Sequence, residues 1–178
     1  MKIYSVTEVL GKYIDWGKIS DYVLAAACLR GTDTHFACHS YVKLGYAIKL
    51  PTDCIGYYES FVNWYHGCVF KTILSETRFT DPNLGFTGRP DFVFELDNGE
   101  IVLTDIKTPL AESPTWKCQL AAYEHLVDKI GGLEVDDIMS LRLHPEGGPA
   151  KGKRYKGSRA AAFNAFLSAL NAHRFING

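Results

Sequence analysis

The pattern of apolar and polar positions predicts helices over the first half of the chain. Residues 19–29 form an apolar, alanine-rich run that predicts a helix, which Gly31 is expected to interrupt. Thr32 or Asp33 could then cap a second helix that continues to about Leu44. This part of the chain therefore predicts two consecutive helices.

A third helix is predicted after Pro51 and Thr52, over residues 53–68. Its apolar and aromatic positions recur at helical spacing, at Tyr58, Phe61, Val62 and Tyr65. The pattern then changes to the short apolar runs that are typical of strands. We predict strands over residues 71–79, 92–96, 101–106 and 138–143.

The remaining segments are predicted to form a helix, a loop and a second helix. Ser113 and Pro114 begin a predicted helix that reaches about Ile130, with Ser113 as its cap and Pro114 at its first position. Residues 145–157 are rich in glycine, proline and basic residues and are expected to form a loop. Residues 158–173 predict an amphipathic terminal helix.

The order of these elements is helices, three strands, a helix, a strand and a helix. This order predicts an α/β or α+β fold with a small mixed central sheet flanked by helices. We expect one domain over residues 1–178, because the length fits a single hydrophobic core. Within it, residues 1–70 are mainly helical, 71–144 hold the sheet core and its helix, and 145–178 hold the basic loop and the terminal helix.

Composition excludes several classes of protein. The N-terminal residues carry frequent charges and no apolar core of a signal peptide, and the longest apolar stretch, residues 22–29, is too short to cross a bilayer. We therefore expect a soluble protein of the cytoplasm, without a membrane partner. Five widely spaced cysteines without a CxxC pair argue against a disulfide framework or a zinc ribbon and favour free thiols. A net charge of -1 excludes binding of polyanions by bulk charge.

The turn at Asp97, Asn98 and Gly99 decides which residues face each other across the predicted hairpin. A two-residue Asn-Gly turn would pair Asp97 with Glu100 and point Asp91 to the other face of the sheet. A three-residue loop with Gly99 in the left-handed conformation would place Asp91 directly opposite Asp105. We predict the three-residue loop.

Two facing carboxylates repel unless a cation lies between them, and their oxygen atoms suit Mg²⁺ or Mn²⁺. Asp105 and Lys107 lie two residues apart on one strand and therefore share a face. An alternative is a solvated edge strand that carries unrelated charges. The flanking residues are apolar on both faces, which argues against that alternative, because burying charges without a function is costly.

Five motifs follow one another along about half of the chain. They are Gly31-x-x-x-His35, Glu76, Gly88-x-x-Asp91, Asp105-x-Lys107 and Gln119-x-x-x-Tyr123. With these motifs in this order, the chain resembles the PD-(D/E)XK nuclease superfamily, in particular RecB-like exonuclease domains with CRISPR-associated and phage relatives. This resemblance implies a restriction-endonuclease-like core with additional helices at the N-terminus.

The resemblance implies that His35, Asp91 and Asp105 bind a divalent metal, Mg²⁺ or Mn²⁺, with the backbone carbonyl of Ile106. Lys107 would position the attacking water and stabilise charge on the phosphate. His39 lies one helical turn after His35, and we expect it to have a structural role or to support the metal ligands.

Three further positions have both a functional and an ordinary structural interpretation. Glu76 could bind a second metal, orient another group or be an ordinary strand carboxylate. Gln119 and Tyr123 share a helix face. They could be an ordinary pair on the helix surface, but the resemblance directs them at the active site and the nucleic-acid strand, and we favour the second interpretation. An iron–sulfur cluster is not expected, because no cysteine follows Cys118.

Basic residues cluster near the C-terminal helix at Lys151, Lys153, Arg154, Lys156 and Arg159. One interpretation is a flexible clamp on the phosphate backbone of a nucleic acid. The other is a solvated loop that balances the nearby acidic residues Glu134, Asp136 and Asp137. We favour the clamp, because a polyanion must be attracted to the catalytic face.

These motifs predict a metal-dependent deoxyribonuclease, with an exonuclease on DNA ends or single strands as the favoured form. Its expected partner is single-stranded DNA or duplex ends, with a role in recombination, repair or phage DNA processing by analogy. One alternative is a PD-(D/E)XK fold that only binds nucleic acid or protein, and another is a restriction-type endonuclease. Whether the chain forms a homo-oligomer or binds a recombination or repair protein stays open.

Overall fold

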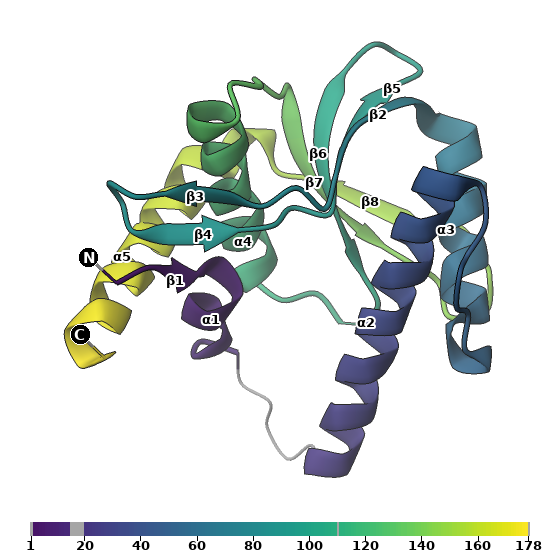
Figure 1. Ribbon diagram of the computed structural model, residues 1–178, viewed down its shortest axis with the longest axis horizontal. Coiled ribbons are helices and arrows are strands. Elements are labelled where there is room, and N and C mark those ends of the chain that lie inside the picture. The colour runs from purple at the N-terminus through teal and green to yellow at the C-terminus, as the bar shows by residue number, and fades with distance from the viewer. Residues whose placement is uncertain (1, 15–19, 110, 178) are drawn as a thin grey trace.

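Two mixed β-sheets flanked by helices organise the chain, as Figure 1 shows. The computed structural model describes residues 2–14, 20–109 and 111–177. The larger sheet has the order β2-β5-β6-β7-β8 and is antiparallel except for the parallel pair β6–β7. Its strands are β2 (Val69–Ser75), β5 (Phe92–Leu96), β6 (Ile101–Lys107), β7 (Asp137–Arg142) and β8 (Lys151–Arg154). The predicted α/β class with a mixed central sheet is confirmed.

Helices cover both faces of this sheet, and Figure 1 shows α2 and α3 on the opposite side from α4 and α5. One layer consists of α2 (Asp21–Leu44) and α3 (Ile55–Cys68). The other consists of α4 (Thr115–His125), a π-helical turn η2 (Leu126–Ile130) that continues it, and α5 (Arg159–Asn177), with α1 (Val6–Gly11) packed beside them. Two short 3₁₀ turns, η1 (Thr52–Cys54) and η3 (Lys156–Ser158), precede α3 and α5.

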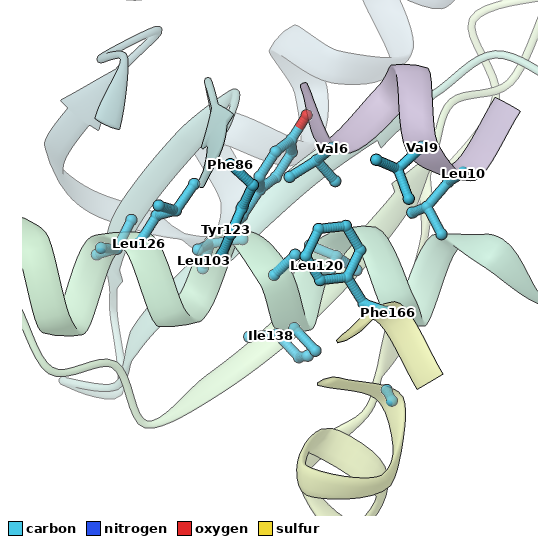
Figure 2. Packing of buried hydrophobic residues seen from close by; sticks show 14 of the residues in the cluster. Val6, Val9, Leu10, Phe86, Leu103, Leu120, Tyr123, Leu126, Ile138 and Phe166 are labelled. Carbon is cyan, nitrogen blue, oxygen red and sulfur yellow. The ribbon is translucent and has the colours of Figure 1, made fainter. Parts of the chain in front are cut away.

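The period of two along β5 and β6 divides their side chains between two hydrophobic cores. Phe92, Phe94 and Val102 point toward Phe61 of α3, whereas Val93 and Leu103 belong to the core beneath α4. Figure 2 shows Leu103 in this second core, together with side chains of α1, α4 and α5. Asp105 and Lys107 lie on the α4 side, where both contact Gln119, and Asp91, just before β5, contacts His35 of α2.

A second, three-stranded sheet, which is not among the predicted elements, stands beside the larger one. It has the order β1-β4-β3 and contains β1 (Tyr4–Ser5), β3 (Phe79–Asp81) and β4 (Phe86–Gly88). The sequence signal was the turn residues Asp81-Pro82-Asn83 between two Phe-Thr pairs. The expected strand over residues 71–79 therefore divides into β2 and β3, with a break at residues 76–78.

The two helices predicted on either side of Gly31 are one continuous helix, α2. Thr32 does not cap a helix; its hydroxyl donates a hydrogen bond to the carbonyl of Cys28 one turn earlier. A glycine inside a long alanine-rich helix costs only about 1 kcal/mol, so the helix continues. The expected end at Leu44 is correct, and Gly45 with a φ of 82° terminates the helix there. Ile19, the expected first residue, lies outside the described residues.

The basic segment expected as a loop over residues 145–157 contains a strand, β8, at the edge of the sheet. All four of its residues are exposed, so the strand has no apolar alternation that a sequence pattern could detect. Gly152 pairs with Leu141 of β7 and packs against the side chain of Met139, where an added Cβ would lie 2.6 Å from the sulfur. None of the helices in the described part of the chain is long and apolar enough to cross a membrane.

Candidate active site

The β5–β6 hairpin has the predicted three-residue loop. The backbone N–H of Leu96 donates to the carbonyl of Glu100 at 2.9 Å, and Gly99 has a φ of 83°. Phe92 consequently pairs with Thr104. One step further along this register, Asp91 lies opposite Asp105, as the sequence predicted.

Asp91 is held in place from two sides. Its Oδ2 accepts a hydrogen bond from the backbone N–H of Ile106 at 2.9 Å, and its Oδ1 lies 3.1 Å from Nδ1 of His35 on α2. Burial by itself raises the pKa of Asp91 and lowers that of His35. The attraction between the two outweighs burial, so the pKa of Asp91 is well below its usual value and that of His35 is raised.

A second histidine of α2 faces the same carboxylate. Nδ1 of His39 lies 2.8 Å from Oγ of Ser75, which orients the ring, and the ring stacks on Phe92. Nε2 of His39 is buried without a hydrogen-bond partner among the described residues, 3.8 Å from Oδ1 of Asp91. The potential ligand atoms of His35, His39 and Asp91 all lie within 4.8 Å of one another. The i, i+4 spacing of the two histidines was the sequence signal for this cluster.

Lys107 belongs to a hydrogen-bonded network between β6 and α4. Its Nζ contacts Oδ2 of Asp105 and donates to Oε1 of Gln119 at 2.9 Å. Nε2 of Gln119 in turn donates to Oδ1 of Asp105 at 3.3 Å and to the hydroxyl of Tyr123 at 3.2 Å. Burial raises the pKa of both Asp105 and Tyr123. The network fixes the position of the Lys107 ammonium group.

Glu76 directly follows β2 and has a strained backbone, with a φ of 52°. A non-glycine residue in this region is uncommon, and such strain is often found at functional sites. Its Oε1 lies 3.5 Å from Nε2 of His39 and 3.7 Å from Nη2 of Arg89. The structure therefore brings Glu76 to the histidine cluster, and its role stays a prediction.

One cavity of about 810 Å³ joins these groups. Seven of the predicted site residues line it: His35, Glu76, Asp91, Asp105, Lys107, Gln119 and Tyr123. Ile106 contributes its backbone N–H to Asp91, a contact that the sequence did not reveal, and the metal role of its carbonyl stays a prediction. The lining also includes Arg78 and Arg89, which are not among the predicted site residues.

The basic residues near the C-terminal helix lie elsewhere. Lys151, Lys153 and Arg154 are on β8, Lys156 is in η3, and Arg159 begins α5; none is among the described residues that line the cavity. Lys153 contacts Glu112, and Arg159 contacts Glu124. Arg154 lies 3.3 Å from Glu100 and 3.4 Å from Asp137. Three of the five therefore have acidic partners, and their role in binding nucleic acid stays a prediction.

The donor atoms at the centre of the site fit a divalent cation. Asp91 offers a carboxylate oxygen, His35 offers an imidazole nitrogen, and Nε2 of His39 is a buried polar atom without a hydrogen-bond partner in the described part of the chain. Asp105, the other expected ligand, lies outside this group and contacts Nζ of Lys107, so its metal role stays a prediction. Mixed imidazole and carboxylate ligands suit Mn²⁺, and carboxylates alone suit Mg²⁺. The residues present are thus compatible with the expected metal.

Comparisons with protein-family models and with curated proteins find no match to this chain. Among solved structures, the chain is similar to LHK-Exo in complex with dAMP, with 14% identity, a TM-score of 0.46 and coverage of 97% of this chain and 87% of that chain. It is also similar to the alkaline exonuclease LHK-Exo from Laribacter hongkongensis, with 13% identity, a TM-score of 0.42 and coverage of 99% of this chain and 91% of that chain. A third similar structure is SSO0001, with 13% identity, a TM-score of 0.42 and coverage of 96% of this chain and 84% of that chain. Likeness at this level carries no argument about function, which rests on the geometry of the site.

Proposed function

We propose that this chain is a divalent-metal-dependent nuclease that hydrolyses DNA phosphodiester bonds, in the form of a RecB-like exonuclease acting on DNA ends or single strands. The observation that carries this proposal is the position of Asp91 opposite Asp105 in a cavity that also holds Lys107. Facing buried carboxylates repel each other unless a cation lies between them. A metal between two acids, with a lysine beside it, suits attack on a phosphodiester.

We assign Mg²⁺ or Mn²⁺ to His35, Asp91, Asp105 and the carbonyl of Ile106, with His39 as an additional nitrogen donor. When bound, the ion would supply positive charge to the non-bridging phosphate oxygens and lower the pKa of a bound water molecule. The hydrogen bond between the backbone N–H of Ile106 and Asp91 keeps that carboxylate aimed at the cavity. The contact between Nδ1 of His39 and Ser75 leaves Nε2 directed toward Asp91.

Lys107 positions the attacking water and stabilises negative charge on the phosphate. Its ammonium group is confined by Asp105 and by Oε1 of Gln119, so it is already oriented before substrate binds. Gln119 is itself held by the hydroxyl of the buried Tyr123. Lys151 and Lys156, with the three ion-paired basic residues near them, would add weaker contacts to the DNA backbone.

The test is to incubate labelled linear, circular and single-stranded DNA with the protein and Mg²⁺ or Mn²⁺. Cleavage of linear DNA is expected with metal, and Lys107→Ala should abolish it while the protein still unfolds at a similar temperature. Lys71→Ala, which removes an exposed lysine of β2 outside the cavity lining, serves as the matched control. Equal rates for the wild type and Lys107→Ala would contradict the nuclease assignment. Circular DNA cleaved as fast as linear DNA would contradict only the exonuclease form.

A further inference from the structure

Two arginines face each other across the strands that lead into the cavity. Phe79 pairs with Gly88 and Thr80 with Thr87 in the antiparallel ladder of β3 and β4. One step further along this register, Arg78 lies opposite Arg89, and both side chains line the cavity. Like charges directly opposite each other on neighbouring strands are destabilising. An anion bound between the two arginines would offset this repulsion, as a cation would between Asp91 and Asp105.

The protein supplies too little negative charge at this position. Nη2 of Arg89 lies 3.7 Å from Oε1 of Glu76, and the side chain of Arg89 stays 51% exposed. Arg78 is exposed, and its side chain has no hydrogen bond or ion pair within the described ranges. Glu76 also faces Nε2 of His39, so one carboxylate is shared between an arginine and the histidine cluster. At least one guanidinium group is left without a counter-charge.

We propose that Arg78 and Arg89 form a phosphate subsite, which binds a backbone phosphate of the nucleic-acid strand next to the phosphodiester that is cleaved. A guanidinium group presents paired N–H donors that match the oxygen atoms of a phosphate. A phosphate between the two arginines would remove their mutual repulsion. This inference rests on the proposed nuclease function and adds the residues that hold the substrate.

The position of the subsite follows from its contacts with the proposed metal ligands. Arg89 precedes Asp91 by two residues, and Glu76 bridges Arg89 to His39. The backbone N–H of Glu76 donates to the carbonyl of Asp91 at 2.9 Å, which ties the two segments together. A strand that places one phosphate at Asp91 and Asp105 can therefore place a neighbouring phosphate at the arginines. The occupant is either an internal phosphodiester or a terminal phosphate.

The test measures binding of a fluorescent single-stranded oligonucleotide by anisotropy, with Mg²⁺ present and in the Lys107→Ala background so that the DNA stays intact. Arg78→Ala and Arg89→Ala should each weaken binding by about tenfold, since a hydrogen bond to a charged group contributes about 1.5 kcal/mol or more. Each should also lower the slope of log affinity against log salt by about 0.7, the value for one phosphate contact on single-stranded DNA. Lys71→Ala should change neither quantity.

The nature of the occupant is decided by repeating the titration with 5′-phosphorylated and 5′-hydroxyl oligonucleotides. A terminal phosphate in the subsite predicts tighter binding of the phosphorylated strand, and this preference should vanish in the Arg78→Ala/Arg89→Ala double variant. An internal phosphodiester predicts equal affinities for both strands and the same loss in the variants. The Arg78→Lys/Arg89→Lys variant should restore the salt slope, because it keeps the charges.

Failure of this inference and failure of the nuclease assignment give different results. An unchanged affinity and salt slope in the double arginine variant, while the wild type cleaves DNA, would refute the subsite and leave the nuclease standing. Arginine-dependent binding without cleavage by the wild type would support the subsite and contradict the nuclease. Both arginines are exposed, so the variants are expected to fold, and a thermal unfolding curve checks this.

Discussion

Gln119 accepts a hydrogen bond from Lys107 at 2.9 Å, and the same amide donates to Asp105 and to Tyr123. One side chain of α4 thus holds both charged groups at the end of β6. Its carbonyl oxygen faces the cation and its nitrogen faces the carboxylate, which is the only orientation of the amide that satisfies both charges. We therefore predict that Gln119 positions Lys107 for the proposed reaction.

Replacing Gln119 by methionine should lower kcat and leave KM for DNA nearly unchanged. The variant keeps the length of the side chain but loses the charge-assisted hydrogen bonds, each of which contributes about 1.5–3 kcal/mol. This corresponds to a fall in kcat of about tenfold to a hundredfold. Steady-state kinetics with single-stranded DNA measure the split between kcat and KM. Lys117→Met, at an exposed position of the same helix, is the control, and a variant that raises KM alone would contradict the positioning role.

Addition of Mn²⁺ should raise the unfolding temperature of the protein. A ligand at a hundredfold excess over its Kd stabilises the native state by about 2.7 kcal/mol, which is an increase of roughly 5–10 °C for a chain of this size. Asp91→Asn and His35→Ala should remove most of this increase, and a chelator should reverse it. His144→Ala, which lies outside the cavity lining, should keep it. A full increase in Asp91→Asn would show that the metal binds elsewhere.

Part of the fold could be predicted because it depends on residues that are close together in the sequence. The turn at Asn98 and Gly99 set the hairpin register, and that register alone placed Asp91 opposite Asp105. The helical period located α3 with its approximate bounds, and Ser113 and Pro114 marked the start of α4. The helix begins one residue later than predicted, at Thr115, so Pro114 and not Ser113 occupies the cap position. In these segments a few neighbouring residues decide the structure, so a sequence pattern contains the necessary information.

Other features depend on contacts between distant parts of the chain. The strand β8 carries only exposed residues and forms because β7 offers it an edge, which no local pattern reveals. His39 joins the site because α2 crosses the end of β2 at Ser75. Arg78 and Arg89 face each other only through the ladder of β3 and β4, which is not among the predicted elements.

Gly88→Ala should destabilise the protein and disturb the position of Tyr123. An added Cβ would lie 2.6 Å and 2.8 Å from two ring carbons of Tyr123, and 2.9 Å from Leu126. Tyr123 is buried, so its ring cannot move aside without repacking of the core in Figure 2. Such overpacking costs about 1–3 kcal/mol.

Urea denaturation measures this cost, with Gly67→Ala as the matched control. A Cβ at Gly67 meets nothing within 4 Å, and the residue lies in α3, where alanine is more favourable than glycine by about 1 kcal/mol. The two glycine variants should therefore shift stability in opposite directions. Equal shifts would contradict the close packing of Gly88 against Tyr123.

Asp81 should make the stability of the protein dependent on pH in the acidic range. Its Oδ2 lies 2.8 Å from Nε2 of His125, and its Oδ1 accepts hydrogen bonds from the backbone N–H groups of Asn83 and Leu84. Burial by itself raises the pKa of Asp81, but the hydrogen bond with His125 and the two N–H donors outweigh it, so the net pKa is lowered. A carboxylate with a lowered pKa in the folded state stabilises the protein above the pKa of the unfolded chain, which is about 3.9.

This stabilisation is lost as the pH falls through the folded-state pKa of Asp81, because the unfolded chain then binds the proton more readily. Asp81→Asn should lower the free energy of unfolding by about 1–3 kcal/mol at neutral pH. The difference from the wild type should shrink as the pH falls from about 4, where the unfolded chain binds the proton, through the lower folded-state pKa, where the folded wild-type carboxylate also becomes protonated. Asp97→Asn, at an exposed position of the hairpin loop, should show no such convergence. If the difference between Asp81→Asn and the wild type stayed constant over this range, the side chain would contribute through packing alone, and the contact between Asp81 and His125 would not be an ionic one.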